Sequence, residues 1–127
     1  MRFFSGFKTA TIDIDRTPTE FTGDDVDRFS SLVDLGGYFS NVTLHIPTID
    51  SAAVSLYVQN NSLIATVPKI VHYRQCSDNA TAAASTTAGT GDIVFTFSTI
   101  AGPVRFLRVH TGANQTADRA FTVVGFD

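Results

Sequence analysis

The sequence has no tryptophan and a single cysteine, Cys76. No intrachain disulfide can therefore form, and the fold must be stable without one. Charge is also scarce: 17% of the residues are charged and the net charge is -3. A nucleic-acid partner would require a basic patch or stripe, so none is expected. No window approaches the roughly 18 apolar residues of a membrane span, and the N-terminus lacks the apolar run of a secretory signal. We therefore expect synthesis in a cytoplasm and no membrane partner.

The sequence is rich in short segments in which apolar and polar residues alternate. Such alternation is typical of half-buried strands, and it is seen in "NVTLHIP", "AAVSLYVQ", "DIVFTFS" and "RAFTVVGF". With "SSLVDLGG", "KIVHYRQ" and "GPVRFLRVHTG", the pattern gives about seven strands. Helical signals are limited to one turn in "TGDDVDRFSSL". The 127 residues suffice for one core, so the sequence predicts an all-β, single antiparallel β-sandwich, jelly-roll-like, with seven to eight strands.

Two segments of the chain depart from this alternation, one before the predicted domain and one within it. Residues 1–28 alternate weakly, and they form either an N-terminal arm that lies on a neighbour or a first strand. Residues 29–127 form the sandwich domain. Within it, "NATAAASTTAGTG" is small, polar and uncharged, which favours a long surface loop over residues 79–91. Turns are expected at Gly36-Gly37 and across residues 47–51.

Residues suited to catalysis or metal binding lack the necessary spacing. The N-terminal acids fit no calcium loop of the helix-loop-helix type, although scattered loop acids of a sandwich can also bind calcium: Asp13, Asp15, Asp24, Asp25 and Asp27. The histidines form no zinc-binding pair: His45, His72 and His110. No nucleophile motif surrounds Cys76. We therefore predict a protein that is not an enzyme, with no catalytic residue, cofactor or metal.

Two groups of residues are candidates for structural or partner contacts. Tyr57, like the other two tyrosines, suits a strand with a polar tip, and could alternatively stack on a sugar. In "GPVRFLRVHTG", Arg105 and Arg108 share a strand with large apolar residues. A guanidinium in such a setting needs a carboxylate, and Asp34 and Asp118 are the expected partners. The alternative is an arginine that faces a ligand or partner.

The order of the strand motifs resembles a group of small β-sandwich proteins from the virions of tailed bacteriophages. In that group a "DLGG" strand is followed by an "IP" corner, a late "VRFLRV"-like strand and a closing "RAFTV"-like strand, as in "VDLGGYFSNVTLHIP" and "VRFLRVHTGANQTADRAFTVVGF" here. The likeness covers about residues 29 to 127. The chain has "QNNSL" where similar proteins often have a "S-x-D-G" hairpin. The pattern is more faintly similar to discoidin-type carbohydrate-binding sandwiches.

The resemblance implies a non-enzymatic structural protein of the virion. It would be a capsid decoration or cement protein, or a small head or tail component, with the major capsid protein or other virion proteins as partners. A homo-oligomer is expected, with a trimer favoured. The alternative is a carbohydrate-binding module that attaches to a host-surface glycan. The expected location is the virion, after synthesis in the host cytoplasm.

Overall fold

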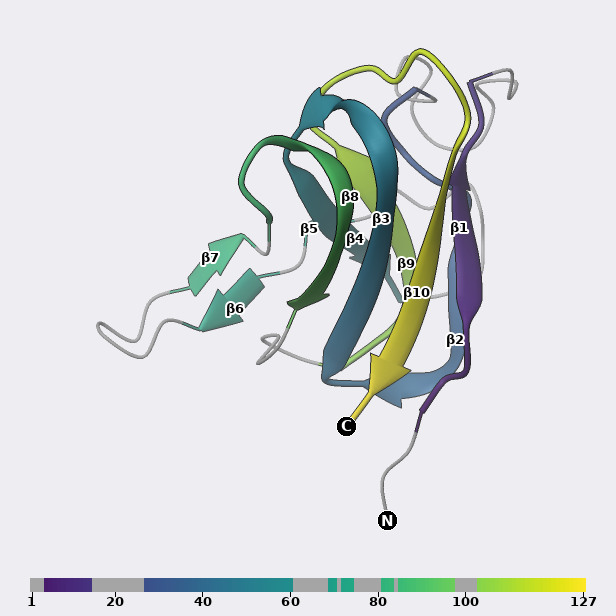
Figure 1. Ribbon diagram of the computed structural model, residues 1–127. Helices are drawn as coiled ribbons and strands as arrows, with labels where there is room; N and C mark the ends of the chain where they lie inside the picture. The colour runs from purple at the N-terminus through teal and green to yellow at the C-terminus, as the bar shows by residue number, and fades with distance from the viewer. Residues whose placement is uncertain are drawn as a thin grey trace.

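The computed structural model describes residues 4–14, 27–60, 69–70, 72–74, 81–83, 85–97 and 103–127. Two four-stranded antiparallel sheets face each other, which confirms the predicted all-β sandwich (Figure 1). The front sheet has the strand order β1 (Lys8–Ile12), β10 (Arg119–Phe126), β3 (Asn41–Ala52) and β8 (Gly89–Phe97). The back sheet has the order β2 (Val33–Phe39), β9 (Val104–Thr111), β4 (Val54–Gln59) and β5 (Lys69–Ile70). A separate hairpin contains β6 (His72–Arg74) and β7 (Thr81–Ala83).

The eight sandwich strands are connected as a jelly roll. The chain pairs from its ends inward: β1 with β10, β2 with β9, β3 with β8, and β4 with β5, all antiparallel. Successive pairs alternate between the front and back sheets. This is the arrangement of one long hairpin wound around itself, as in double-sheet jelly rolls.

The core lies between the sheets and follows the alternation seen in the sequence. In β3, Val42, Leu44 and Ile46 are buried. In β10, Phe121 and Val123 are completely inaccessible to solvent. The other core positions come from both sheets: Ala10, Ile12, Val33, Leu35, Phe39, Ile49, Val54, Leu56, Phe97, Val104, Leu107 and Val109. The period of two in β3 and β10 arises because these strands bury one face and leave the other partly exposed, whereas β9 is largely buried on both faces.

The segment for which an arm and a first strand were both considered contains β1. Its five residues pair with β10, and Ala10 and Ile12 are buried in the core. Residues 27–31 form hydrogen bonds with strands of both sheets. The Ser31 amide donates to the Thr11 carbonyl of β1 at 2.9 Å, while the Ser30 amide donates to the Val109 carbonyl of β9 at 2.8 Å. Residues 22–26 of the stretch in which a helical turn was predicted lie outside the described residues, and residues 27–32 form no helix.

Two expected turns are irregularities within strands. Gly36 lies inside β2 with a φ of 80°, and the β2–β9 register shifts between Asp34 and Phe39. Pro47 lies inside β3, whose register with β8 shifts between Thr48 and Ala52. Glycine is tolerated in strands at such bulges, and Pro47 lies beyond His45, the last residue of β3 that pairs with β10. The turn predictions at these positions are therefore wrong.

The prediction of a surface loop over residues 79–91 is also wrong in two places, because parts of this range lie in strands. Thr81–Ala83 is β7, and β8 already begins at Gly89. The first residues of β8 are exposed or half-buried, so no apolar alternation marks them as a strand. Periodicity detects strands by their buried face, and an edge with little burial escapes it.

Candidate interaction surface

The outer face of the front sheet carries a short N-terminal extension of β1. The Ser5 amide donates to the Gly125 carbonyl at 2.8 Å, and the Gly125 amide donates to the Ser5 hydroxyl at 2.8 Å. Phe4 forms a bridge with Phe126, and Gly6 turns the chain with a φ of 75°. These contacts fix the segment against β10.

Two large apolar side chains of this segment remain in solvent. Phe4 is 62% exposed and Phe7 is 78% exposed. Between them and the sheet lies a groove of about 380 Å³, which is lined by Phe4, Gly6, Phe7, Thr43, His45, Val124 and Phe126. Exposed apolar patches of this kind mark sites of association on soluble proteins.

A second hollow of about 360 Å³ continues the same face toward β8. It is lined by His45, Ile46, Pro47, Asp92, Ile93, Val94, Ala120 and Thr122. His45, an exposed residue of β3, borders both hollows. The outer face of the front sheet, which we call the front face, therefore presents an apolar groove at β1 and β10 and a more polar hollow toward β8.

The sequence analysis did not select Phe4 and Phe7. The signal is in "MRFFSGFK", where three phenylalanines surround a serine and a glycine beside the first strand. Their significance depends on the return of this segment to β10, the last strand of the chain, which no local pattern reveals.

Arg105 and Asp34 are brought together as predicted. The Arg105 Nε donates to Asp34 Oδ1 at 2.9 Å, and its Nη2 donates to Oδ2 at 3.3 Å. The pair joins β9 to β2 on the surface, and the guanidinium also lies 4.9 Å from the ring centroid of Phe106. Mainly because of the Arg105 hydrogen bond, and then that of the Gly36 amide, the pKa of Asp34 is lowered. Its partner responds in the opposite sense: the Asp34 hydrogen bond raises the pKa of Arg105.

Arg108 is completely buried, and one of its hydrogen bonds goes to a backbone carbonyl, whereas Asp34 and Asp118 contact other groups. Its Nη1 donates to the backbone carbonyl of Ser30 at 3.0 Å. Ser30 itself is buried, and its hydroxyl accepts from the Val109 amide at 2.8 Å. Arg108 therefore ties β9 to the segment that joins the two sheets.

Within the described structure, Asp118 contacts neither Arg105 nor Arg108. Its Oδ1 accepts a hydrogen bond from the Ile14 amide at 3.1 Å, just beyond the end of β1. A different ion pair lies near that loop: the carboxylate of Asp50 in β3 is 3.5 Å from the Nη2 of Arg119. The prediction that Asp118 pairs with Arg105 or Arg108 is therefore wrong, because the partners depend on how the loop at residues 112–118 folds.

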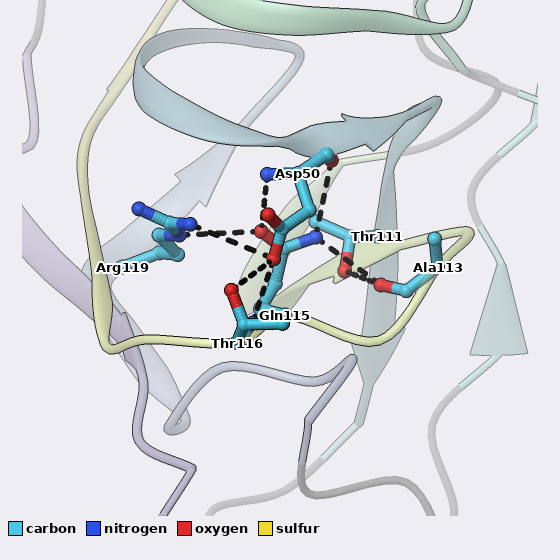
Figure 2. A network of polar contacts seen from close by, with 6 residues as sticks. All are labelled: Asp50, Thr111, Ala113, Gln115, Thr116 and Arg119. Atoms are coloured by element: carbon cyan, nitrogen blue, oxygen red, sulfur yellow. Dashed lines mark hydrogen bonds and ion pairs between the residues drawn. The ribbon is translucent and has the colours of Figure 1, made fainter.

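Figure 2 shows this loop held to β3 by a polar network that the sequence analysis missed. The Thr116 amide and hydroxyl donate to Asp50 Oδ2 at 2.7 and 2.9 Å, and the Asp50 amide donates to Gln115 Oε1 at 2.9 Å. The Thr111 hydroxyl donates to the Ala113 carbonyl at 2.9 Å. The pKa of Asp50 is lowered, chiefly by the Thr116 amide and then by the Thr116 hydroxyl. The network fixes the loop to β3.

Tyr57 packs against two neighbouring rings. Its ring centroid lies 4.9 Å from that of Phe29, at an interplanar angle of 85°, and 4.9 Å from that of His110. Phe29 and His110 are 4.5 Å apart, which closes the group. The half-buried Tyr57 therefore contributes to the outer side of the back sheet as a packed ring, and its contacts are those of a structural residue.

Within the residues that the structure describes, no three histidine, cysteine, aspartate or glutamate side chains gather as a metal site would require. Asp15, Asp24, Asp25 and Cys76 lie outside those residues, as do the side chains of His72 and Tyr73. The described part of the chain also has no helix with the length and hydrophobicity to cross a membrane.

Comparisons with known proteins give one match, at the level of structure. No family model matches the chain, and no curated protein matches its sequence. The crystal structure of the SPBc2 prophage-derived protein YomS is similar to this chain with a TM-score of 0.51 and 11% sequence identity. The similarity covers 100% of this chain and 96% of the other. At this identity the likeness shows the fold alone. A prophage-derived protein therefore has a similar fold.

Proposed function

We propose that this protein is a non-enzymatic structural component of a bacteriophage virion that binds the assembled particle through its front face. The finer role is that of a capsid decoration or cement protein, or of a small head or tail component. Its partner there is the major capsid protein or another virion protein, and its location is the virion.

The observation that carries this proposal is the exposure of Phe4 and Phe7 on a segment fixed to β10. Two phenylalanines held in solvent are costly to a protein that acts alone, because apolar surface is stabilised by removal from water. The hydrogen bonds between Ser5 and Gly125 hold them in place before a partner arrives. A preformed apolar groove on a rigid sheet loses little conformational entropy when it binds, which favours a protein partner.

Two further observations support a phage particle as the setting. The strand order of motifs resembles virion sandwiches, and the structural neighbour YomS is described as prophage-derived. The polar networks at Asp34 and Asp50 tie strands and loops together, which suits a rigid building block. A glycan-binding role is less well supported, because Tyr57 uses its ring against Phe29 and His110.

The proposal is tested by binding the purified protein to phage particles assembled without it, with co-sedimentation as the readout. Burying a phenylalanine side chain is worth about 1.5–3 kcal/mol. Phe7→Ser should therefore weaken particle binding about tenfold or more. Its melting temperature should match that of the parent, because the side chain is already exposed.

Tyr38→Ser is the matched control. Tyr38 is 58% exposed but lies on β2 of the back sheet, so this variant should bind particles like the parent. Equal binding by Phe7→Ser and the parent would overturn the front-face proposal. Strong binding of the isolated protein to a glycan array, with no binding to particles, would favour the adhesion module instead.

A further inference from the structure

The edge of the front sheet at β8 has a free backbone ladder in the described structure. Among the described strands, β8 pairs with β3 alone, so no described strand is hydrogen-bonded to its other side. An exposed row of amides and carbonyls is a template for another strand. Native proteins normally shorten, bend or cover such edges.

The other sheet edges in the described part of the chain are protected in these ways. β5 has two residues. β2 is interrupted by its register shift near Gly36. β1 is short, and Thr11 exchanges hydrogen bonds with Ser31 on its outer side. The β8 edge differs from all three in length and regularity.

Only the first part of β8 is irregular. Gly91 and Asp92 have positive φ values of 79° and 58°, and the register with β3 shifts in the same region. Gly91 also passes so close to the Pro47 carbonyl that a side chain would overlap it. From Ile93 to Phe97 the pairing with β3 is regular. The segment 93–97 is therefore a regularly paired, uncharged strand edge.

The exposure of this segment identifies the shape of its partner. Ile93 is 50% exposed and Val94 is 60% exposed, although successive side chains of a strand point to opposite faces. A protein that docked flat on the front face would cover Val94 but would reach Ile93 only where it borders the hollow beside His45, because Ile93 pairs with the buried Ile46. A neighbouring strand covers both, because its own side chains alternate between the same two faces.

We infer that the partner is β8 of a second copy, paired antiparallel about a two-fold axis at Phe95. In this register Ile93 lies opposite Phe97 of the second copy and Phe95 lies opposite its counterpart, so the core side of the junction is wholly apolar. Val94 lies opposite Thr96 on the outer side. Asp92, the one charged residue of β8, falls outside the paired segment and does not face itself. The two front sheets then form one continuous sheet, in an isologous dimer.

Analytical ultracentrifugation over a range of concentrations tests this pairing. The parent protein should sediment as a reversible dimer. Ile93→Lys places a charge opposite Phe97 at the junction and should raise the dissociation constant about tenfold or more. Tyr38→Lys, at an equally exposed site on the edge strand of the back sheet, should associate like the parent. A parent protein that stays monomeric into the submillimolar range would overturn the inference, as would equal association of Ile93→Lys.

Hydrogen exchange of backbone amides in the parent protein gives an independent test. It uses no variant, so a folding defect cannot affect the result. Amides of residues 93–97 that point away from β3 should exchange rapidly in dilute solution and slowly in concentrated solution. Unchanged exchange in this segment while a dimer forms would place the contact elsewhere and contradict the pairing. Phe7→Ser should dimerise normally, because the groove is separate from the β8 edge. Failure of particle binding and failure of dimerisation are therefore distinguishable.

Discussion

Arg105 and Arg108 lie three residues apart on β9 and have opposite surroundings. Arg105 makes a bidentate pair with Asp34 on the surface, where water and salt weaken the attraction. Arg108 is fully buried and donates to the Ser30 carbonyl. The hydrogen bond in the interior is the one whose loss leaves an acceptor without water, so Arg108 matters more for stability.

Substitution of each arginine by methionine separates these roles. Arg108→Met removes a donor from a buried carbonyl and should lower the free energy of unfolding by on the order of 1–3 kcal/mol. Arg105→Met removes an exposed pair and should leave the urea midpoint close to that of the parent. Equal and large losses in both variants, measured by urea unfolding, would show that the surface pair is as important as the buried one.

Ser30→Ala tests the other half of the same contact. The Ser30 hydroxyl accepts from the buried Val109 amide, so its removal leaves that donor unpaired. We expect a loss of about 1–3 kcal/mol in the free energy of unfolding. Ser85→Ala is the control, because the Ser85 hydroxyl is exposed and donates to the carbonyl of the adjacent Thr86. A parent-like Ser30→Ala variant would rule out a structural role for this hydroxyl.

The sequence allowed the pairing of Arg105 with Asp34 to be predicted, but not the hydrogen bond from Arg108 to the Ser30 carbonyl. A carboxylate and a guanidinium attract each other whichever strands carry them, so residue type is informative. The Ser30 carbonyl is a backbone group, and every residue has one. Its position beside Arg108 depends on the path of residues 27–31 between the sheets, which only the assembled fold determines.

At the scale of elements, strands with one buried face could be predicted and strands at the margin could not. β10 and the first half of β3 bury every second residue, and their alternation is visible in the sequence. The first three residues of β8, at positions 89–91, have no buried member and were predicted as part of a loop. The front-face groove was missed for a related reason, because it depends on β1 meeting β10 from the other end of the chain.

The place of β1 in the front sheet leads to a prediction about Ile12. Its side chain is completely buried, so Ile12→Ala should lower the free energy of unfolding by about 2–5 kcal/mol. Deletion of residues 1–20 should destabilise the domain further, because it also removes the partner of β10. If the deleted protein melts like the parent, as a detachable arm would allow, β1 contributes nothing to the fold. Thermal unfolding by circular dichroism measures both.

At the scale of the whole molecule, two networks make stability depend on acid. The pKa values of Asp34 and Asp50 are both lowered in the folded protein. The folded state therefore binds fewer protons than the unfolded state as the pH approaches the ordinary aspartate pKa of about 3.9. The stabilisation is complete above that value and is lost as the pH falls through the lowered pKa values.

Melting temperatures measured from neutral pH down to acid should thus fall steeply below a pH of about 4. The double variant Asp34→Asn with Asp50→Asn should be less stable at neutral pH and should show a shallower decline. Thr116→Val, which removes the hydroxyl but keeps the amide that donates to Asp50, should give a smaller change of the same sign. Parallel acid profiles for the parent and the double variant would mean that other groups control the acid response.

The most direct test of the central proposal is a cryo-electron microscopy reconstruction of the intact phage particle at a resolution that shows side chains. It should contain the β-sandwich on the particle, with Phe4 and Phe7 buried against another virion protein. A particle that lacks the protein would contradict the account. So would a sandwich bound by its back sheet, with both phenylalanines left in solvent.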